Sequence, residues 1–231
     1  MIKRHQPFQL AYGLAESLCS YAKHSARQHE NNNENIIPSA CAMHRITSSY
    51  ISDYNTARQQ ELTVVDGSST QLLTMGAYGL GNHASGLPPL DALLHIRNLF
   101  TQTKQESNEV ESVDDQNTAV TETDDNRELI LGPLRHFLTL LHSKPAEAAS
   151  SYERWQKAAK EHSSFNFTDF TEQVKRIYGD SYNDKHMPFL HNPEGSQCTL
   201  IGDLVHLVEA KGVSNDLNNT DKDDGAPNDE R

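Results

Sequence analysis

The sequence predicts an α+β protein in which a helix, a strand and a β-ribbon are followed by a helical C-terminal region. Three observations lead to this fold class. Residues 7–27 place apolar side chains at spacings of three and four, which is the helical period. Residues 62–78 show the pattern strand, Asp66-Gly67 turn, strand. Helical periods then return between residues 129 and 210.

The first helix has the longest amphipathic pattern in the chain. Pro7 suits a first helical turn, where its missing N–H costs nothing. The opposite face carries Lys23 and Arg27, one turn apart. The stripe expected to be buried is made of small and apolar residues: Phe8, Ala11, Ala15, Leu18, Cys19, Ala22 and Ala26.

Residues 36–47 are predicted to form a buried strand because they are small or apolar and lie between polar clusters. Residues 50–61 are predicted to be one helical segment. The strands at 62–65 and 71–78 are expected to form the β-ribbon, followed by a glycine-marked loop. Pro88-Pro89 then opens a helix.

The domain boundaries follow from composition. Residues 1–103 form the first α/β region, and residues 104–127 are predicted to be an acidic, disordered linker because they contain almost no bulky apolar residue. Residues 128–212 are expected to be helical. Residues 213–231 form a polar, acidic tail, also predicted to be disordered.

Residues typical of helix N-termini divide the helical region 128–212 into separate helices. Ser143 followed by Pro145 predicts a cap and the first turn of a helix that places Trp155 in the core. Asp169 and Glu172 have capping-box spacing. Thr199 is expected to cap the last helix.

The net charge of −12 belongs mainly to two segments, because residues 104–128 and 214–231 hold almost all of the excess acids. The rest is nearly neutral, so a broad basic surface for direct nucleic-acid binding is not indicated. Three widely spaced cysteines signal neither a disulfide framework nor a zinc site. With no long apolar run and no signal-peptide pattern, no membrane partner is expected and a cytoplasmic location is the default.

The order of these elements and three motifs carry a resemblance to a known family. The motifs are PFQLAYGLAESLCSYAK, SACAMHRITSS and LTVVDGSSTQLLTMGAYGL. They resemble the part that follows the catalytic hairpin in the second palm domain of the large polymerase-like subunit of type III CRISPR effector complexes, and its stand-alone relatives in defence loci. The resemblance implies a partial ferredoxin-like palm in residues 1–103. It places His5 and His44 where the family has site-lining histidines.

The first helix is also similar to a helix of the more distant GGDEF-type cyclases. Ala15, Glu16, Ala22, Lys23 and Arg27 match its pattern A-D-x(5)-A-K-x(3)-R, with Glu16 in place of the aspartate. In those enzymes this lysine and arginine side faces the nucleotide triphosphate. The resemblance therefore implies phosphate binding by Lys23 and Arg27. A solvated helix face is the alternative for these two residues, and a packed strand histidine is the alternative for His44.

The family's chemistry needs two metal-binding acids in a GGDD-like hairpin, and the intact relatives bind nucleotide triphosphate with Mg²⁺ or Mn²⁺. No GGDD or GGDE sequence occurs in this chain. We therefore expect the C-terminal part, or a remnant, of a palm protein of antiviral defence. It should have no cyclase activity alone and should complete a nucleotide-binding palm with an upstream segment or with CRISPR effector subunits. The alternative is a non-catalytic, mostly helical adaptor.

Overall fold

The computed structural model describes most of the chain, with several gaps. The described residues are 8–29, 37–46, 52–67, 69–81, 86–101, 119–163, 165–179, 182, 188–191 and 196–220. Side chains are described in all of these except 119–129, 191 and 211–220. His5, one of the predicted site-lining residues, lies outside the described residues.

The predicted α+β class is confirmed, and helices make up most of the described chain. The elements, in chain order, are α1 (Phe8–Gln28), β1 (Ser39–Ala42), α2 (Tyr54–Gln60), β2 (Thr63–Asp66), β3 (Ser69–Leu72), β4 (Ala77–Leu80), α3 (Leu90–Thr101), α4 (Ala119–Ser143), α5 (Pro145–Glu161), α6 (Phe167–Tyr178), β5 (Leu190–His191), β6 (Gln197–Cys198) and α7 (Ile201–Thr220).

The described strands form two small sheets. β1 pairs with β4 in an antiparallel, two-stranded sheet. The second sheet has the order β2-β3-β6-β5, in which β3 and β6 run parallel. The single strand predicted at 71–78 is therefore wrong, because Gly76, at φ 86°, breaks it into β3 and β4. The two-residue strands β5 and β6 carry too short a pattern to be predicted.

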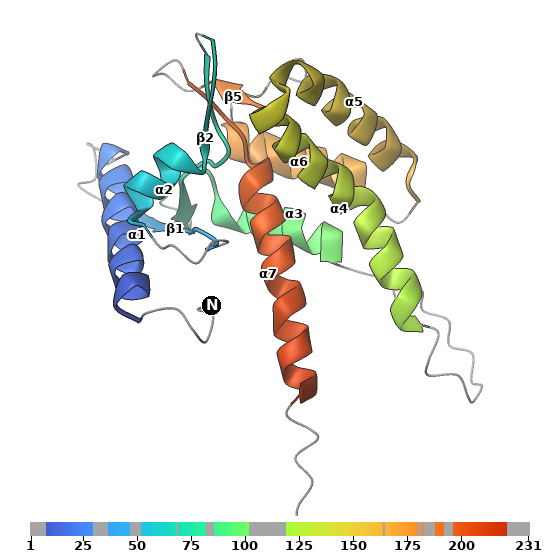
Figure 1. Ribbon diagram of the computed structural model, residues 1–231, viewed down its shortest axis with the longest axis horizontal. Helices are drawn as coiled ribbons and strands as arrows, with labels where there is room; N and C mark the ends of the chain where they lie inside the picture. Colours follow the sequence, from blue (N-terminus) through green and yellow to red (C-terminus); the bar gives the residue numbers. More distant parts are fainter. Residues whose placement is uncertain are drawn as a thin grey trace, which may run out of the picture.

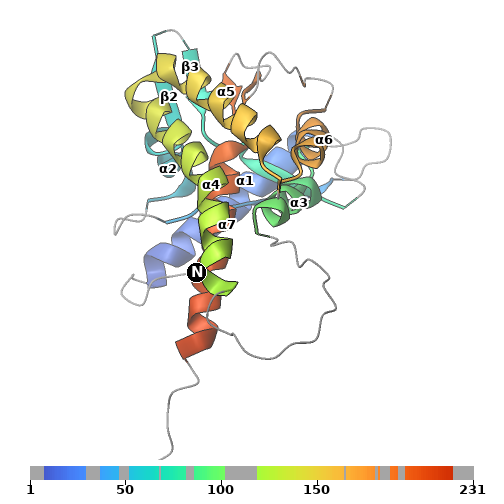
Figure 2. The same cartoon turned by 90° about the vertical axis from the view of Figure 1, so that its right-hand side faces the viewer.

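Figure 1 shows how the elements are arranged. α1, β1 and α2 lie on one side of the molecule, and α4 and α5 lie on the other. α7 stands between these sides and contacts both α3 and α4. In Figure 2, as in Figure 1, the β2–β3 ribbon projects at one end of the molecule. Because β6 pairs with β3, the region predicted to be helical, residues 128–212, shares a sheet with the β-ribbon.

One large core joins the helices. Trp155 is 2% exposed, and its indole Nε1–H donates to the carbonyl of Ile130 at 2.9 Å. This confirms the prediction that Trp155 is a core residue. A smaller core lies between α1 and α2 and contains Ala11, Leu14 and Tyr54. These two helices are also joined by a 2.9 Å hydrogen bond from the Tyr54 N–H to the Ser17 Oγ.

The predicted buried stripe of α1 is wrong for part of its length. Ala11, Ala22 and Ala26 are buried as expected. Phe8 is 77% exposed, and Ala15 and Cys19 are exposed as well. The helix is turned so that Leu14 packs toward α2, because the small core there takes the larger side chain. An apolar strip of α1 is left outside the cores.

Several predicted boundaries also change. α4 begins at Ala119, inside the range expected to be linker, and α7 runs to Thr220, inside the expected tail. The cap of α6 is Asn166, whose side chain accepts from the N–H of Asp169, so Asp169 lies within the first turn. Ser143 ends α4 and does not cap α5.

Candidate functional site

A groove between α1 and β1 is lined by two of the predicted site residues, Lys23 and Arg27. Its volume is about 680 Å³, and it is open on one side. The lining comes from one face of α1 and from the start and length of β1: Ala15, Leu18, Cys19, Ala22, Lys23, Ala26, Arg27, Ile37, Pro38, Ser39, Ala40, Cys41 and Ala42.

Small side chains on both walls leave this space unfilled. α1 contributes Ala15, Ala22 and Ala26 to its wall. Cys41 packs against the large core, so strand alternation turns Ala40 and Ala42 to the opposite face, where α1 lies. Alanine facing alanine cannot fill the distance between a helix and a strand, so a groove results.

The charged residues that line the groove are both basic. Lys23 and Arg27 are exposed and lie near the C-terminal end of α1, four residues apart on one face. Lysine offers a compact point charge, and arginine offers a planar fork of donors that matches phosphate or carboxylate oxygens. The structure thus brings both predicted phosphate-binding residues to one open hollow, whose other lining residues are apolar except for Ser39.

His44 lies elsewhere. Its side chain is 5% exposed, and its Nε2 is 3.7 Å from the Glu61 carboxylate. Its ring also stands edge-on to the ring of Tyr54, with centroids 6.0 Å apart. Burial lowers the pKa of His44, and the charge of Glu61 opposes this shift. His44 is not among the residues that line the groove, so the structure does not place it beside Lys23 and Arg27.

Asp203, on the first turn of α7, is a buried polar residue whose environment could not be read from the sequence. It is 4% exposed, and its Oδ2 accepts the Met75 N–H at 2.9 Å and the Tyr78 hydroxyl at 2.6 Å. Burial raises the pKa of Asp203 to about 6, against the lowering effect of these hydrogen bonds. This carboxyl fastens α7 to the β3–β4 connection and to β4. Its role is therefore structural.

A second link between the two sides of the molecule is made of charged residues. Glu209 of α7 accepts from the Arg135 Nε of α4 at 2.7 Å, and it also pairs with Arg45, which follows β1. A carboxylate between two guanidinium groups is well compensated, so this cluster stabilises the position of α7.

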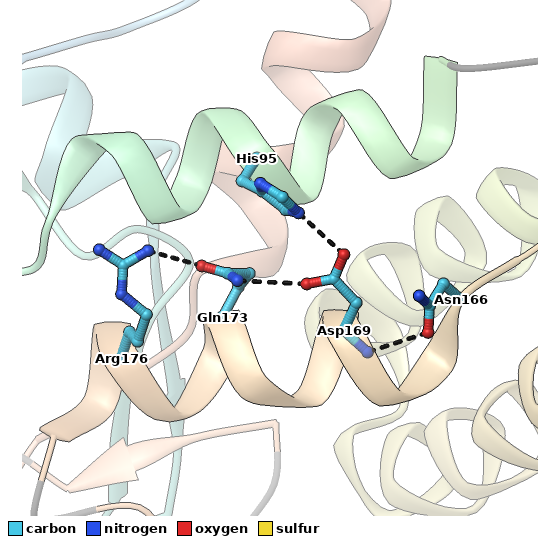
Figure 3. A network of polar contacts seen from close by, with 5 residues as sticks. All are labelled: His95, Asn166, Asp169, Gln173 and Arg176. Carbon is cyan, nitrogen blue, oxygen red and sulfur yellow. Dashed lines mark hydrogen bonds and ion pairs between the residues drawn. The ribbon is translucent and has the colours of Figure 1, made fainter.

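The polar network in Figure 3 joins α3 to α6. His95 Nε2 lies 2.8 Å from the Asp169 Oδ2, and the Gln173 amide donates to the other oxygen of Asp169 at 3.2 Å. Arg176 continues the network through a 2.8 Å bond to Gln173 and a 2.6 Å bond to Asp91. The polar groups of these side chains bond to one another, so the network holds α3 and α6 together at the surface, and we call it the α3–α6 clamp.

Comparison with known proteins gives no relative: no family model, no curated protein and no solved structure matches this chain. Among the described residues, no three His, Cys, Asp or Glu side chains are grouped so as to hold a metal ion. None of the described helices is both long enough and apolar enough to cross a membrane.

Proposed function

We propose that this chain supplies the phosphate-side half of a nucleotide-binding palm of the CRISPR-associated type and has no cyclase activity by itself. One observation carries the proposal: Lys23 and Arg27 are the charged residues lining the open groove between α1 and β1. These are the two residues that the resemblance to palm-domain proteins assigns to triphosphate binding.

In this proposal the two cations bind the phosphates of a nucleoside triphosphate. The Lys23 ammonium neutralises charge as a point donor, and the Arg27 guanidinium donates to two phosphate oxygens at once. Ala22 and Ala26, beside these cations on the groove wall, let a phosphate chain approach the helix closely. Together the two side chains bind and orient the phosphates but do not catalyse the transfer of a nucleotidyl group.

The Mg²⁺ or Mn²⁺ that the intact relatives use does not fit the groove as this chain builds it. No carboxylate is among the lining residues, and hard divalent ions need several oxygen ligands. The metal-binding acids are therefore assigned to another polypeptide, and this chain's own residues supply no step of a transfer reaction.

Binding of ATP by the full chain tests the proposal directly. We expect weak binding, with a Kd on the order of 1 mM, because two partly exposed charge contacts contribute only a few kcal/mol. The double variant Lys23→Ala/Arg27→Ala should weaken binding at least tenfold in a titration followed by NMR. Arg154→Ala/Lys157→Ala, on the exposed face of α5, makes the same charge change away from the groove and should have no effect beyond a small electrostatic one.

Binding that is equal in both double variants would contradict the assignment of Lys23 and Arg27. The DNA upstream of the codon for Met1 offers a second test. A reading frame there with a GGDD-like hairpin, whose product forms a stable complex on co-expression, is the expected result. A chain that finds no such partner and binds no ATP would overturn the proposal.

The adaptor hypothesis remains the second candidate because most of the large core is built by helices. Its helices bury Leu93, Ile96, Leu131 and Phe137 completely. A helical adaptor would use an outer surface of this bundle and would not need the groove beside α1. Partner binding that survives blocking of the groove would favour this alternative.

A further inference from the structure

The outer edge of β1 carries backbone groups whose direction can be derived from the sheet. The N–H of Gly79 in β4 donates to the carbonyl of Pro88 at 2.8 Å, so it points away from β1. In an antiparallel ladder, both backbone groups of a residue point to the same side, and opposite residues share this property. Ala40 is opposite Gly79, and Ala42 is two residues further along. The N–H and C=O groups of Ala40 and Ala42 therefore point away from β4, toward the outer edge.

Within the described residues, β1 pairs only with β4, so this outer edge has no strand beside it. An edge strand with open donors and acceptors is a template for another strand. The edge also forms the floor of the groove, since all four residues of β1 line it. A strand that pairs there would place alternate side chains into the hollow against Ala15 and Ala22 of α1.

An exposed apolar strip of α1 continues the groove. Tyr12, which is 62% exposed, lies one turn after Phe8 on the same face, and Ala15 and Cys19 follow at helical spacing. Ile37, 49% exposed, adds an apolar side chain where β1 begins. These side chains offer apolar contacts to an extended segment that enters the groove.

Charge indicates what kind of segment fits the groove. Lys23 and Arg27 are the charged residues at the groove, so a segment with acidic residues is attracted there. A second copy of this chain is disfavoured, because pairing β1 with β1 would bring both copies of Lys23 and Arg27 to one seam.

We propose that the groove between α1 and β1 binds an extended, acidic segment of another polypeptide, which adds a strand to β1 through the backbone of Ala40 and Ala42. This goes beyond the proposed function, because it names a protein segment and where it docks; an acidic segment held by Lys23 and Arg27 would compete with a nucleotide for these two cations. It does not require that a nucleotide be bound.

Amide exchange on the full chain tests the pairing. The probe is a blocked ten-residue peptide that alternates valine with aspartate. We expect saturating peptide to slow exchange at Ala40 and Ala42 at least tenfold, and to leave Cys41 nearly unchanged because its N–H already pairs with β4. A peptide with lysine in place of aspartate should bind at least tenfold more weakly.

Two variants separate charge from backbone pairing. Lys23→Glu/Arg27→Glu should weaken binding of the aspartate peptide at least tenfold, whereas the matched reversal Arg154→Glu/Lys157→Glu on α5 should not. Ala40→Pro removes one outward N–H without touching the β1–β4 bonds, and it should abolish the exchange protection. If Ala40→Pro does not fold, the charge reversals and the exchange pattern still decide.

Three results would overturn the proposal. Ala40 and Ala42 amides already protected in the dilute chain would mean that a segment of this chain covers the edge. Protection that grows with protein concentration, together with dimers in light scattering, would mean that a second copy covers it. Peptide binding that ignores the charge reversals and Ala40→Pro would place the peptide elsewhere. Peptide binding without any ATP binding would instead refute the nucleotide function and leave this docking site standing.

Discussion

Replacing Asp203 with asparagine should remove a pH dependence from the stability of the protein. Asparagine has the shape of aspartate but cannot ionise. Its Oδ1 can take the place of the carboxylate oxygen that accepts from the Met75 N–H and the Tyr78 hydroxyl. Its amide group can donate to the hydroxyl of Thr74, which is also close to the carboxyl. The variant thus keeps the link between α7 and β4 while losing the buried charge.

The magnitude follows from the pKa of Asp203. This pKa is 3.8 for an ordinary aspartate and about 6 in the folded protein. Because the folded state holds the proton more tightly, its stability is greatest below pH 4 with respect to this group and falls as the pH rises to 6. Each unit of pKa difference corresponds to 1.36 kcal/mol, so the free energy of unfolding falls by about 3 kcal/mol between full protonation and full ionisation of Asp203.

Urea unfolding at steps of pH from 4.0 to 7.5, followed by circular dichroism, measures this effect. The difference in the free energy of unfolding, Asp203→Asn minus wild type, should rise by about 2.5 kcal/mol across this range, because the contributions of the other carboxyl groups cancel in the difference. Asp203→Ala serves as the contrast, because it leaves buried donors without an acceptor and should destabilise at every pH. A difference that stays flat between pH 4 and pH 7 would refute the reasoning, since Asp203 would then titrate alike in both states.

Two further predictions concern packing and the α3–α6 clamp. Gly202→Ala should destabilise the protein by about 3 kcal/mol, because the added Cβ would overlap the carbonyl oxygen of Leu73. Gly13→Ala, where the added Cβ meets open space, should stabilise the helix by about 0.5–1 kcal/mol. Equal melting temperatures for the two variants would contradict this reasoning. His95→Ala should raise the pKa of Asp169, which its hydrogen bond to His95 lowers, and a carboxyl titration followed by NMR that shows no shift would mean that this contact is absent in solution.

Local patterns predicted the helices well and the strands poorly. α1 was predicted within a residue or two at each end, because its period extends over six turns. The rotation of α1 was not predicted, since it depends on how Leu14 and Tyr54 pack together. β6 consists of two residues whose pairing with β3 joins segments 126 residues apart, and no local pattern carries that information.

The candidate site was predicted in part for a similar reason. Lys23 and Arg27 could be named because their spacing on one helix matches a known pattern. Their position beside a hollow could not be predicted from the sequence, because the hollow depends on alanines from β1 as well as from α1. The burial of Asp203 was also hidden, because an aspartate in a first helical turn is ordinary and only the position of Met75 and Tyr78 makes it a link.

The parallel pairing of β3 with β6 has a consequence for how the chain is made. Gln71 and Leu72 find their partners in Gln197 and Cys198, 126 residues further along the chain. During synthesis the edge of β3 that pairs with β6 therefore stays unpaired until Gln197 and Cys198 have left the ribosome. Contacts this distant in sequence form slowly and leave nascent chains open to aggregation. The protein should consequently depend on chaperones during translation more than its helical content suggests.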